Sequence, residues 1–456
     1  MKITVGTQKG KITTDNPKLL TALQRLYTFR VPGASYSAAY RRRSWDGKKR
    51  FISNTGTFRS GLLPKILEHL KKIDCTPEVE FNPPQIEAPP LATFSNIKYY
   101  DYQEDLIAQA LKIGRATITA PTGSGKTFIM AGIVESLKDK KMVILFNTKQ
   151  LLRQTYDFFK DVCRIEGLGV CFGEGYIYGD IMLCTVQSIE KILDTHLETA
   201  EVLMVDECHE FCSGRRTLAA IESFPTAAWR YGFTATVPSE AIKRHSLEGA
   251  LGPVLQSVNT QELVEKGKLT KPIIQLIERK YEAEGEDDHL SYLEVYDKYI
   301  VYNSQRNEKI KDIVKEIIDG NQRARILILT KSLDHGRTLE NLLRDTHVQF
   351  LEGADSLGER YKSISEFLGA RTGSTLIGTK ILQTGINIEE ITHFINARGM
   401  KSEIATIQAL GRALRVSDNK DVVYIYDFVD KEKYLSKHSR ERISHYKKEG
   451  HEVTIL

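Results

Sequence analysis

Apolar positions recur with two different periodicities along most of this chain. Short runs that suit strands lie at 116–119, where apolar and polar residues alternate, and at 142–146, 181–184, 202–205 and 325–330, which are mainly apolar. Between them, apolar residues recur at helical spacing, as they do over 128–137 and 332–343. This alternation predicts an α/β fold in which parallel sheets are flanked by helices. Because it stops before residue 270 and resumes near 325, we predict two such domains in tandem.

The first 90 residues have a different pattern. Residues 1–5 and 10–13 alternate as short strands, Asn16-Pro17 opens a leucine-rich helix, and 61–71 has the pattern of an amphipathic helix. Proline pairs at 83–84 and 89–90 indicate a linker. We therefore predict a small α+β domain over residues 1–90, followed by α/β domains over 91–270 and 271–456. The charged, tyrosine-rich stretch 287–307 is interpreted as a helical insertion.

Length and composition limit the class of protein. A chain of 456 residues is too long for one hydrophobic core, and its 41% hydrophobic and 27% charged residues are ordinary for a globular protein. No apolar run approaches the length of a membrane span, and the N-terminus lacks the apolar core of a signal peptide. Six cysteines without framework spacing suit a reducing compartment. We therefore expect a cytoplasmic protein without a membrane partner.

Positive charge is concentrated at the start of the chain. Residues 1–90 hold 16 Lys and Arg against 7 Asp and Glu, whereas the remainder is slightly acidic. Six of the ten residues from 41 to 50 are basic, and Asp46-Gly47 among them is a hairpin signal. We predict a basic β-hairpin that contacts nucleic acid, with Trp45 favoured as a local core residue over a stacking platform. The candidate contacts are Arg41, Arg42, Arg43, Trp45, Lys48 and Lys49.

Residues 120–127, Ala-Pro-Thr-Gly-Ser-Gly-Lys-Thr, lie between a predicted strand and a predicted helix, as a phosphate-binding loop requires. Gly123 and Gly125 let backbone N–H groups turn toward phosphates, and the helix N-terminus adds partial positive charge. In such a loop we expect Lys126 to reach the β- and γ-phosphates of ATP and the Thr127 hydroxyl to ligate Mg²⁺. The predicted nucleotide-binding residues are Gln103, Thr122, Gly123, Ser124, Gly125, Lys126 and Thr127, with Gln103 placed to read adenine.

A second candidate group follows the apolar run at 202–205. Asp206 suits Mg²⁺ held through water, and Glu207 can polarise the water that attacks the γ-phosphate. Polar groups also follow other predicted strands, among them Lys149 and Gln187. Ligands bind at the carboxyl ends of strands in open α/β sheets. We therefore expect a binding surface along this edge.

These groups together resemble the motifs of superfamily 2 helicases. Residues 120–127 resemble motif I in the variant that begins with alanine, 206–209 (Asp-Glu-Cys-His) resemble motif II, and 234–236 (Thr-Ala-Thr) resemble motif III. Residues 377–388 resemble motif V, although Asn387 stands where the family usually has aspartate. The resemblance implies two RecA-like domains that close on ATP and Mg²⁺ and move along nucleic acid.

The remaining site residues follow from the same resemblance. Residues 408–415 resemble motif VI, which implies a catalytic role for Gln408 and arginine fingers at Arg412 and Arg415. Gly385 of motif V is expected to contact the nucleotide. The implied nucleic-acid contacts in the two motor domains are Lys149, Gln187, Thr330, Thr379 and Lys380.

The basic first domain ahead of a compact motor resembles the UvsW-type helicases of tailed phages, which remodel branched DNA. That resemblance implies fork regression, Holliday-junction branch migration and R-loop unwinding, in the host-cell cytoplasm if a phage encodes the chain. Branched or forked DNA is the expected partner, with no obligate protein partner and a monomeric state. Three alternatives stay open: an RNA helicase, a duplex translocase that does not separate strands, and a nucleotide-dependent DNA clamp.

Overall fold

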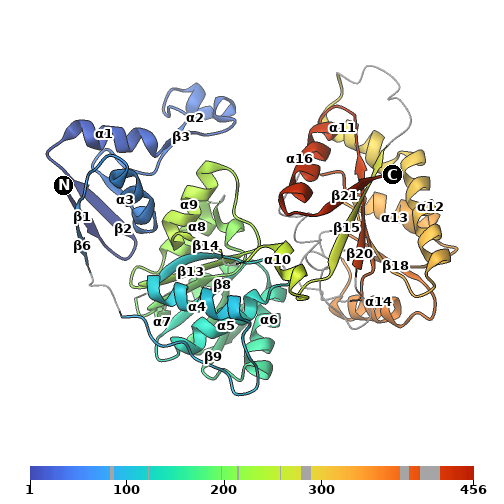
Figure 1. Cartoon of the computed structure of the whole chain (residues 1–456), viewed down its shortest axis with the longest axis horizontal. Coiled ribbons are helices and arrows are strands. Elements are labelled where there is room, and N and C mark those ends of the chain that lie inside the picture. The colour runs from blue at the N-terminus through green and yellow to red at the C-terminus, as the bar shows by residue number, and fades with distance from the viewer. Residues whose placement is uncertain are drawn as a thin grey trace. The chain divides into compact units, whose positions relative to one another are not determined.

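The computed structural model describes all residues except 83–86, 122, 197, 213–214, 257, 279–288, 353, 380–389 and 401–421. The chain divides into two compact units, residues 1–120 with 125–257, and residues 121–124 with 258–456. Helices flank the sheets in both (Figure 1). None of the helices in the described part of the chain is long and apolar enough to cross a membrane.

The first unit begins with a small mixed α+β part. Its four-stranded sheet has the order β5-β2-β1-β6, in which β1 pairs with β2 antiparallel and with β6 parallel. Asn16 caps the first helix by accepting a hydrogen bond from the Leu19 N–H, and Pro17 occupies the first turn. The elements are β1 (Lys2–Val5), β2 (Lys9–Thr13), α1 (Pro17–Leu26), β5 (Thr57–Arg59), α3 (Leu63–Lys71) and β6 (Glu78–Phe81).

The predicted hairpin around Asp46-Gly47 is wrong. Residues 38–41 form the short helix α2 (Ala38–Arg41), and β4 (Lys48–Arg50) pairs antiparallel with β3 (Thr28–Arg30). Gly47 does adopt a left-handed backbone, with φ 73°, but it turns the chain into β4 from a loop. Asp46-Gly47 therefore does mark a turn, as predicted. The strand that follows it, β4, pairs with β3, which lies about twenty residues earlier in the sequence.

An eight-stranded sheet follows in the same unit, in the order β10-β9-β11-β8-β12-β13-β7-β14. Neighbouring strands in this order are parallel, except that β10 pairs with β9 antiparallel. Helices α4 and α5 pack in one core and α8 and α9 in another, one on each face. The elements are α4 (Asp101–Ile113), β7 (Arg115–Thr119), α5 (Lys126–Ser136), β8 (Met142–Phe146), α6 (Lys149–Asp157), β9 (Leu168–Phe172), β10 (Gly175–Ile177), β11 (Ile181–Thr185), α7 (Leu193–His196), β12 (Val202–Val205), α8 (Arg215–Glu222), β13 (Trp229–Thr234), α9 (Ala241–Leu251) and β14 (Val254–Gln256).

The second unit holds a seven-stranded parallel sheet in the order β17-β18-β16-β19-β20-β15-β21. Helices α12 and α13 pack on one core, and α14 and α16 on the other. The elements are α10 (Thr260–Glu265), β15 (Lys271–Glu278), α11 (Tyr292–Tyr296), α12 (Ser304–Gly320), β16 (Arg325–Leu329), α13 (Leu333–Leu342), β17 (His347–Leu351), α14 (Leu357–Gly369), β18 (Ser374–Gly378), β19 (His393–Asn396), β20 (Val422–Val429), α16 (Leu435–Lys448) and β21 (Glu452–Ile455). The predicted fold class is therefore confirmed: two α/β domains with parallel sheets, preceded by a small mixed sheet.

Candidate active site and nucleic-acid interface

The phosphate loop joins β7 to α5, as the sequence predicts. Gly123 and Gly125 have φ values of 86° and 82°, in the left-handed region that favours glycine. A side chain at Gly125 would also place its Cβ 2.6 Å from Nε2 of Gln103. Lys126 is the first residue of α5, and its ammonium donates a hydrogen bond to the Ala120 carbonyl at 3.3 Å. The loop backbone is thus shaped for an anion at a helix N-terminus.

Gln103 lies beside this loop, on the first turn of α4. Its side chain is 2% exposed, and its Oε1 accepts a hydrogen bond from the Tyr100 N–H at 3.0 Å. The side chain therefore helps to cap α4 while its amide faces Gly125. The predicted adenine contact stays a prediction. Of the other loop residues, Ser124 is buried and Thr127 half-buried, and Thr122 lies outside the described residues.

Asp206 and Glu207 follow the fully buried strand β12, which is separated from β7 by β13 alone. Parallel strands end at the same edge, so both carboxylates lie at the edge that carries the phosphate loop. Burial of the Asp206 carboxyl raises its pKa well above the usual range, the neighbouring Glu207 raises it further, and Lys126 opposes both effects. Glu207 has a φ of 45°, which is uncommon for a residue with a side chain. This backbone turns Glu207 away from the strand direction.

His209 and Thr234 complete the arrangement; both lie in the predicted motifs II and III, but neither was among the predicted site residues. His209 is 6% exposed, and its Nδ1 lies 2.9 Å from Thr234 Oγ1 and 3.4 Å from Glu207 Oε2. Thr234 ends β13, the strand between β7 and β12. His209 therefore connects the second motif to the third. The sequence shows both residues within recognisable motifs, Asp-Glu-Cys-His and Thr-Ala-Thr. Only the folded sheet shows that His209 and Thr234 contact each other.

Two predicted nucleic-acid residues of the first motor domain come together at neighbouring strand ends. Lys149 begins α6 directly after β8 and is exposed, whereas Gln187 follows β11, the strand next to β8. The Gln187 amide donates a hydrogen bond to the Asn147 carbonyl at 3.3 Å. Both side chains thus lie along one edge of the sheet, as expected. Their contact with nucleic acid remains a prediction.

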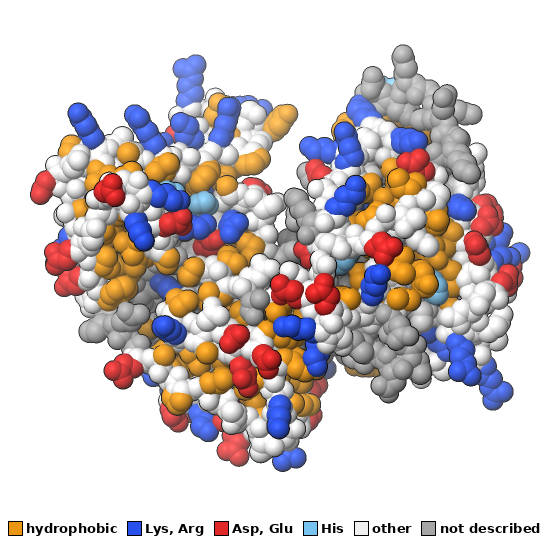
Figure 2. All heavy atoms as spheres, in the orientation of Figure 1, with side chains coloured by type: hydrophobic (Ala, Val, Ile, Leu, Met, Phe, Trp, Pro, Cys, Tyr) orange, Lys and Arg blue, Asp and Glu red, His pale blue; other side chains and the backbone are white. Residues whose placement is uncertain are grey.

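The basic stretch of the N-terminal part divides into two groups. Arg41, Arg42, Arg43 and Lys48 are exposed, and Lys and Arg side chains stand on the surface of this part in Figure 2. Lys49 instead donates a hydrogen bond from Nζ to Ser246 Oγ at 2.9 Å, so it packs against α9.

Trp45 also differs from its predicted role. It is half-buried rather than a core residue, and its Nε1 donates a hydrogen bond to the Lys48 carbonyl at 2.9 Å. Lys49 and Trp45 therefore both make hydrogen bonds within the fold.

In the second unit, Thr330 and Thr379 follow the adjacent parallel strands β16 and β18. Thr330 is only 1% exposed, and its hydroxyl donates a hydrogen bond to the Ser332 carbonyl at 3.3 Å. The Thr330 side chain is therefore buried and bonded within the fold, whereas Thr379 is half-buried; contact of either residue with nucleic acid stays a prediction. The other predicted residues of this unit lie outside the described residues: Lys380, Gly385, Gln408, Arg412 and Arg415.

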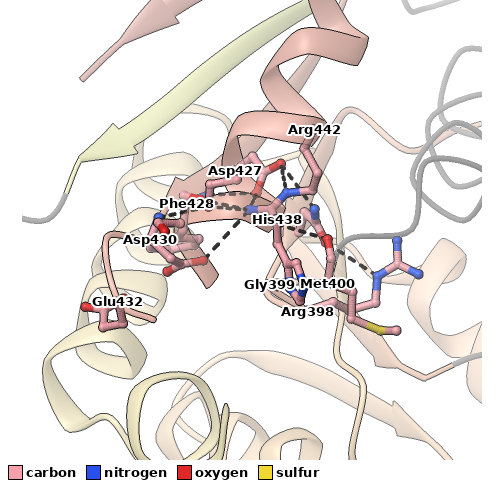
Figure 3. Close-up of polar contacts among 12 residues, drawn as sticks. Arg398, Gly399, Met400, Asp427, Phe428, Asp430, Glu432, His438 and Arg442 are labelled. Carbon is pink, nitrogen blue, oxygen red and sulfur yellow. Dashed lines mark hydrogen bonds and ion pairs between the residues drawn. The ribbon is translucent and has the colours of Figure 1, made fainter. Parts of the chain in front are cut away.

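A buried charged network, the Asp427 cluster, joins β20, α16 and Met400 (Figure 3). Asp427 on β20 accepts hydrogen bonds from Nε and Nη2 of Arg442 on α16, at 2.9 and 3.1 Å. It also accepts one from the Tyr446 hydroxyl at 2.6 Å, and Arg442 Nη1 donates to the Met400 carbonyl at 3.0 Å. Helix α16 is therefore fixed to the sheet by the buried guanidinium of Arg442.

Two family models match the chain, one on each side of its centre. Residues 96–239 match the model described as "Type III restriction enzyme, res subunit", and residues 308–417 match "Helicase conserved C-terminal domain". The first range includes the phosphate loop, Glu207 and Thr234, and the second includes the predicted motifs V and VI. With the geometry above, these matches place the chain in superfamily 2 of the helicases, as an ATP-hydrolysing helicase or translocase.

The individual proteins that this chain resembles have low sequence identity to it. The chain is 22% identical over 471 residues to the "ATP-dependent DNA helicase uvsW" of Enterobacteria phage T4, with 93% of this chain and 92% of that protein covered. It is 24% identical over 387 residues to the "DNA 3'-5' translocase XPB2" of Sulfurisphaera tokodaii, with 75% and 84% covered. Among solved structures, the DNA-bound Type ISP restriction-modification enzyme LlaBIII is similar, with a TM-score of 0.60, 16% identity, and 79% of this chain and 31% of that chain covered. The last similarity supports the fold alone.

Proposed function

We propose that this superfamily 2 helicase acts on branched DNA, where it regresses forks, migrates Holliday junctions and unwinds R-loops. The observation that carries this proposal is the exposed cluster of Arg41, Arg42, Arg43 and Lys48 on the part of the chain that precedes the motor. Such a cluster suits phosphate backbone rather than base edges. Similarity to the phage T4 helicase over nearly the whole length of both proteins supports the same reading.

The nucleotide chemistry follows from residues at one sheet edge. Lys126 binds the β- and γ-phosphates, and Glu207, held by His209, orients the water that attacks the γ-phosphate. Thr127 and Asp206 are the residues that would hold Mg²⁺, because a hydroxyl and a carboxylate are the oxygen donors this ion prefers. The raised pKa of Asp206 fits this role, since the buried carboxyl is poorly compensated by the described residues alone. A bound Mg²⁺ would neutralise phosphate charge. We assign Arg412 and Arg415 to the same reaction from their motif.

The duplex translocase is the second candidate, since residues 96–239 match a model from restriction enzymes. The two candidates share the motor and differ in whether DNA strands separate. Strand displacement measured beside translocation on the same fork distinguishes them, because a pure translocase consumes ATP without releasing a labelled strand.

The proposed DNA grip is tested by neutralising the four exposed basic residues to glutamine. We expect weaker binding to forks and junctions, with ATP turnover in the absence of DNA unchanged. The matched control neutralises Lys71 and Lys72, which are exposed at the end of α3 in the same part of the chain. Unchanged junction affinity across a salt series, or an equal loss in the control, would contradict the proposal.

A further inference from the structure

Helix α9 lies between the N-terminal part and the segment that carries the catalytic carboxylates. One side of the helix contacts the N-terminal part through charge. The Glu248 side chain is only 2% exposed, and it forms an ion pair with Lys65 of α3 and another, at 3.0 Å, with Arg244 on its own helix. A buried carboxylate needs such partners, because an uncompensated charge there is costly. The pair with Lys65 therefore fastens α3 to α9.

Close packing reinforces this contact. A side chain at Gly61 would bring its Cβ into collision with the Glu248 carbonyl oxygen. The His245 ring lies against Phe29 and Phe51, with ring centroids 4.7 and 5.4 Å apart, and Ile242 packs on the core of the N-terminal part. This side of α9 is therefore continuous with that core.

The contact between α9 and the N-terminal part lies next to Lys48, one of the four exposed basic residues proposed to bind DNA. In β4, Lys48 is exposed, whereas the next residue, Lys49, donates its hydrogen bond to Ser246 of α9. Successive residues of a strand point to opposite faces. If Lys48 binds a phosphate, the next residue along the strand, Lys49, is the one that contacts α9.

The other side of α9 contacts the catalytic segment. Leu247 and Leu251 share a buried core with Cys208 and Phe211. At Gly232 the packing is so close that an added Cβ would meet both Leu251 and Cys208, the latter at 2.8 Å. Cys208 opens the 3₁₀ helix η5 (Cys208–Cys212), which also carries His209. One helix therefore contacts both the N-terminal part and η5, the short helix whose His209 lies 3.4 Å from Glu207.

We infer that Glu248 is a positioning residue through which DNA bound to the N-terminal part stimulates ATP hydrolysis. Helix α9 transmits the state of the N-terminal part to Cys208 and His209, and so to the orientation of Glu207. The inference rests on the proposed DNA grip. It goes further by assigning the activating contact to α9 rather than to DNA held by the motor domains alone.

The test compares Glu248→Gln with Glu240→Gln in the full chain. Glu240 precedes α9 and pairs with Lys243 at 2.9 Å near the surface, so the same substitution there leaves the contact with the N-terminal part intact. The measurements are ATP hydrolysis with and without forked DNA, the KM for ATP, and the Kd for the fork. Lys65→Met, which removes the other partner, serves as a second variant, with thermal unfolding recorded for all three.

For Glu248→Gln and Lys65→Met we expect the stimulation of kcat by DNA to fall about two- to thirty-fold. Hydrolysis without DNA, the KM for ATP and the Kd for the fork stay at wild-type values, and Glu240→Gln behaves as wild type. Wild-type stimulation in both interface variants would overturn the inference, as would an equal loss of hydrolysis without DNA. Absence of fork binding by the wild type would instead refute the proposed grip.

Discussion

Replacing Asp427 with asparagine should destabilise the second unit strongly. The Asp427 and Arg442 side chains are each 1% exposed, and three side chains donate hydrogen bonds to the Asp427 carboxylate: Arg442, Tyr446 and Asn396. Asparagine keeps the size but removes the charge that compensates the guanidinium. Breaking one partner of a buried ion pair costs about 3–5 kcal/mol. Asp430 Oδ2 lies 3.8 Å from Arg442 Nη2 and would still partly compensate the charge of the guanidinium. We therefore expect the free energy of unfolding to fall by an amount near the lower end of this range.

Urea unfolding of the full chain, with hydrogen exchange followed over 422–448, measures this loss and assigns it to the second unit. Asp345→Asn is the matched control, because Asp345 pairs with Lys315 where both side chains are about half-exposed, and exposed pairs of this kind contribute little to stability. Replacing both Asp427 and Arg442 with apolar residues should cost less than Asp427→Asn alone. An equal effect of Asp427→Asn and Asp345→Asn would refute the reasoning.

Three further outcomes are expected. Lys126→Ala should lower ATP hydrolysis by about a hundredfold or more with the fold intact by circular dichroism, and residual turnover near wild type would exclude the assigned phosphate site. Changing Arg41, Arg42 and Arg43 to alanine should reduce the slope of log affinity for forks against log salt by about 0.9 per lost phosphate contact, whereas an unchanged slope would remove these residues from the interface. Burial lowers the pKa of His335 to about 3, so the unfolded chain binds a proton below about pH 6.5 that the folded chain does not. His335 should therefore contribute about 2 kcal/mol of stability above pH 6.5 that is lost on going to pH 5. The other buried histidines, His393 among them, add to the slope, so His335→Gln should reduce the fall in stability by about 2 kcal/mol, and an unchanged fall would contradict the assignment.

The sequence predicts the motor fold well because its signals are local. The apolar run 202–205 and the loop 120–127 each specify a strand end, and parallel strands bring those ends to one edge. The pairing of β4 with β3 is different, since Asp46-Gly47 indicates a turn but not which strand lies opposite. Long-range pairing overrides the local hairpin signal there.

The candidate site was predictable where chemistry resides in a motif and not where it depends on contacts through space. Lys126 and Glu207 are identified by residue type and spacing. The bond between His209 and Thr234 joins residues on different strands, and the contact of Lys49 with Ser246 joins the N-terminal part to α9. Thr330 lies at a strand end where the motif implies a ligand contact, but its side chain is buried and donates a hydrogen bond to the Ser332 carbonyl.

The most direct test of the central claim is ATP-dependent remodelling of a panel of labelled substrates: forks, Holliday junctions, R-loops, plain DNA duplexes and RNA duplexes. Each is assayed with the wild type and with Lys126→Ala. The proposed function predicts that the wild type remodels forks and junctions more rapidly than plain DNA duplexes, and that Lys126→Ala remodels none of them. Activity confined to RNA duplexes, or equal activity of Lys126→Ala on forks, would contradict it.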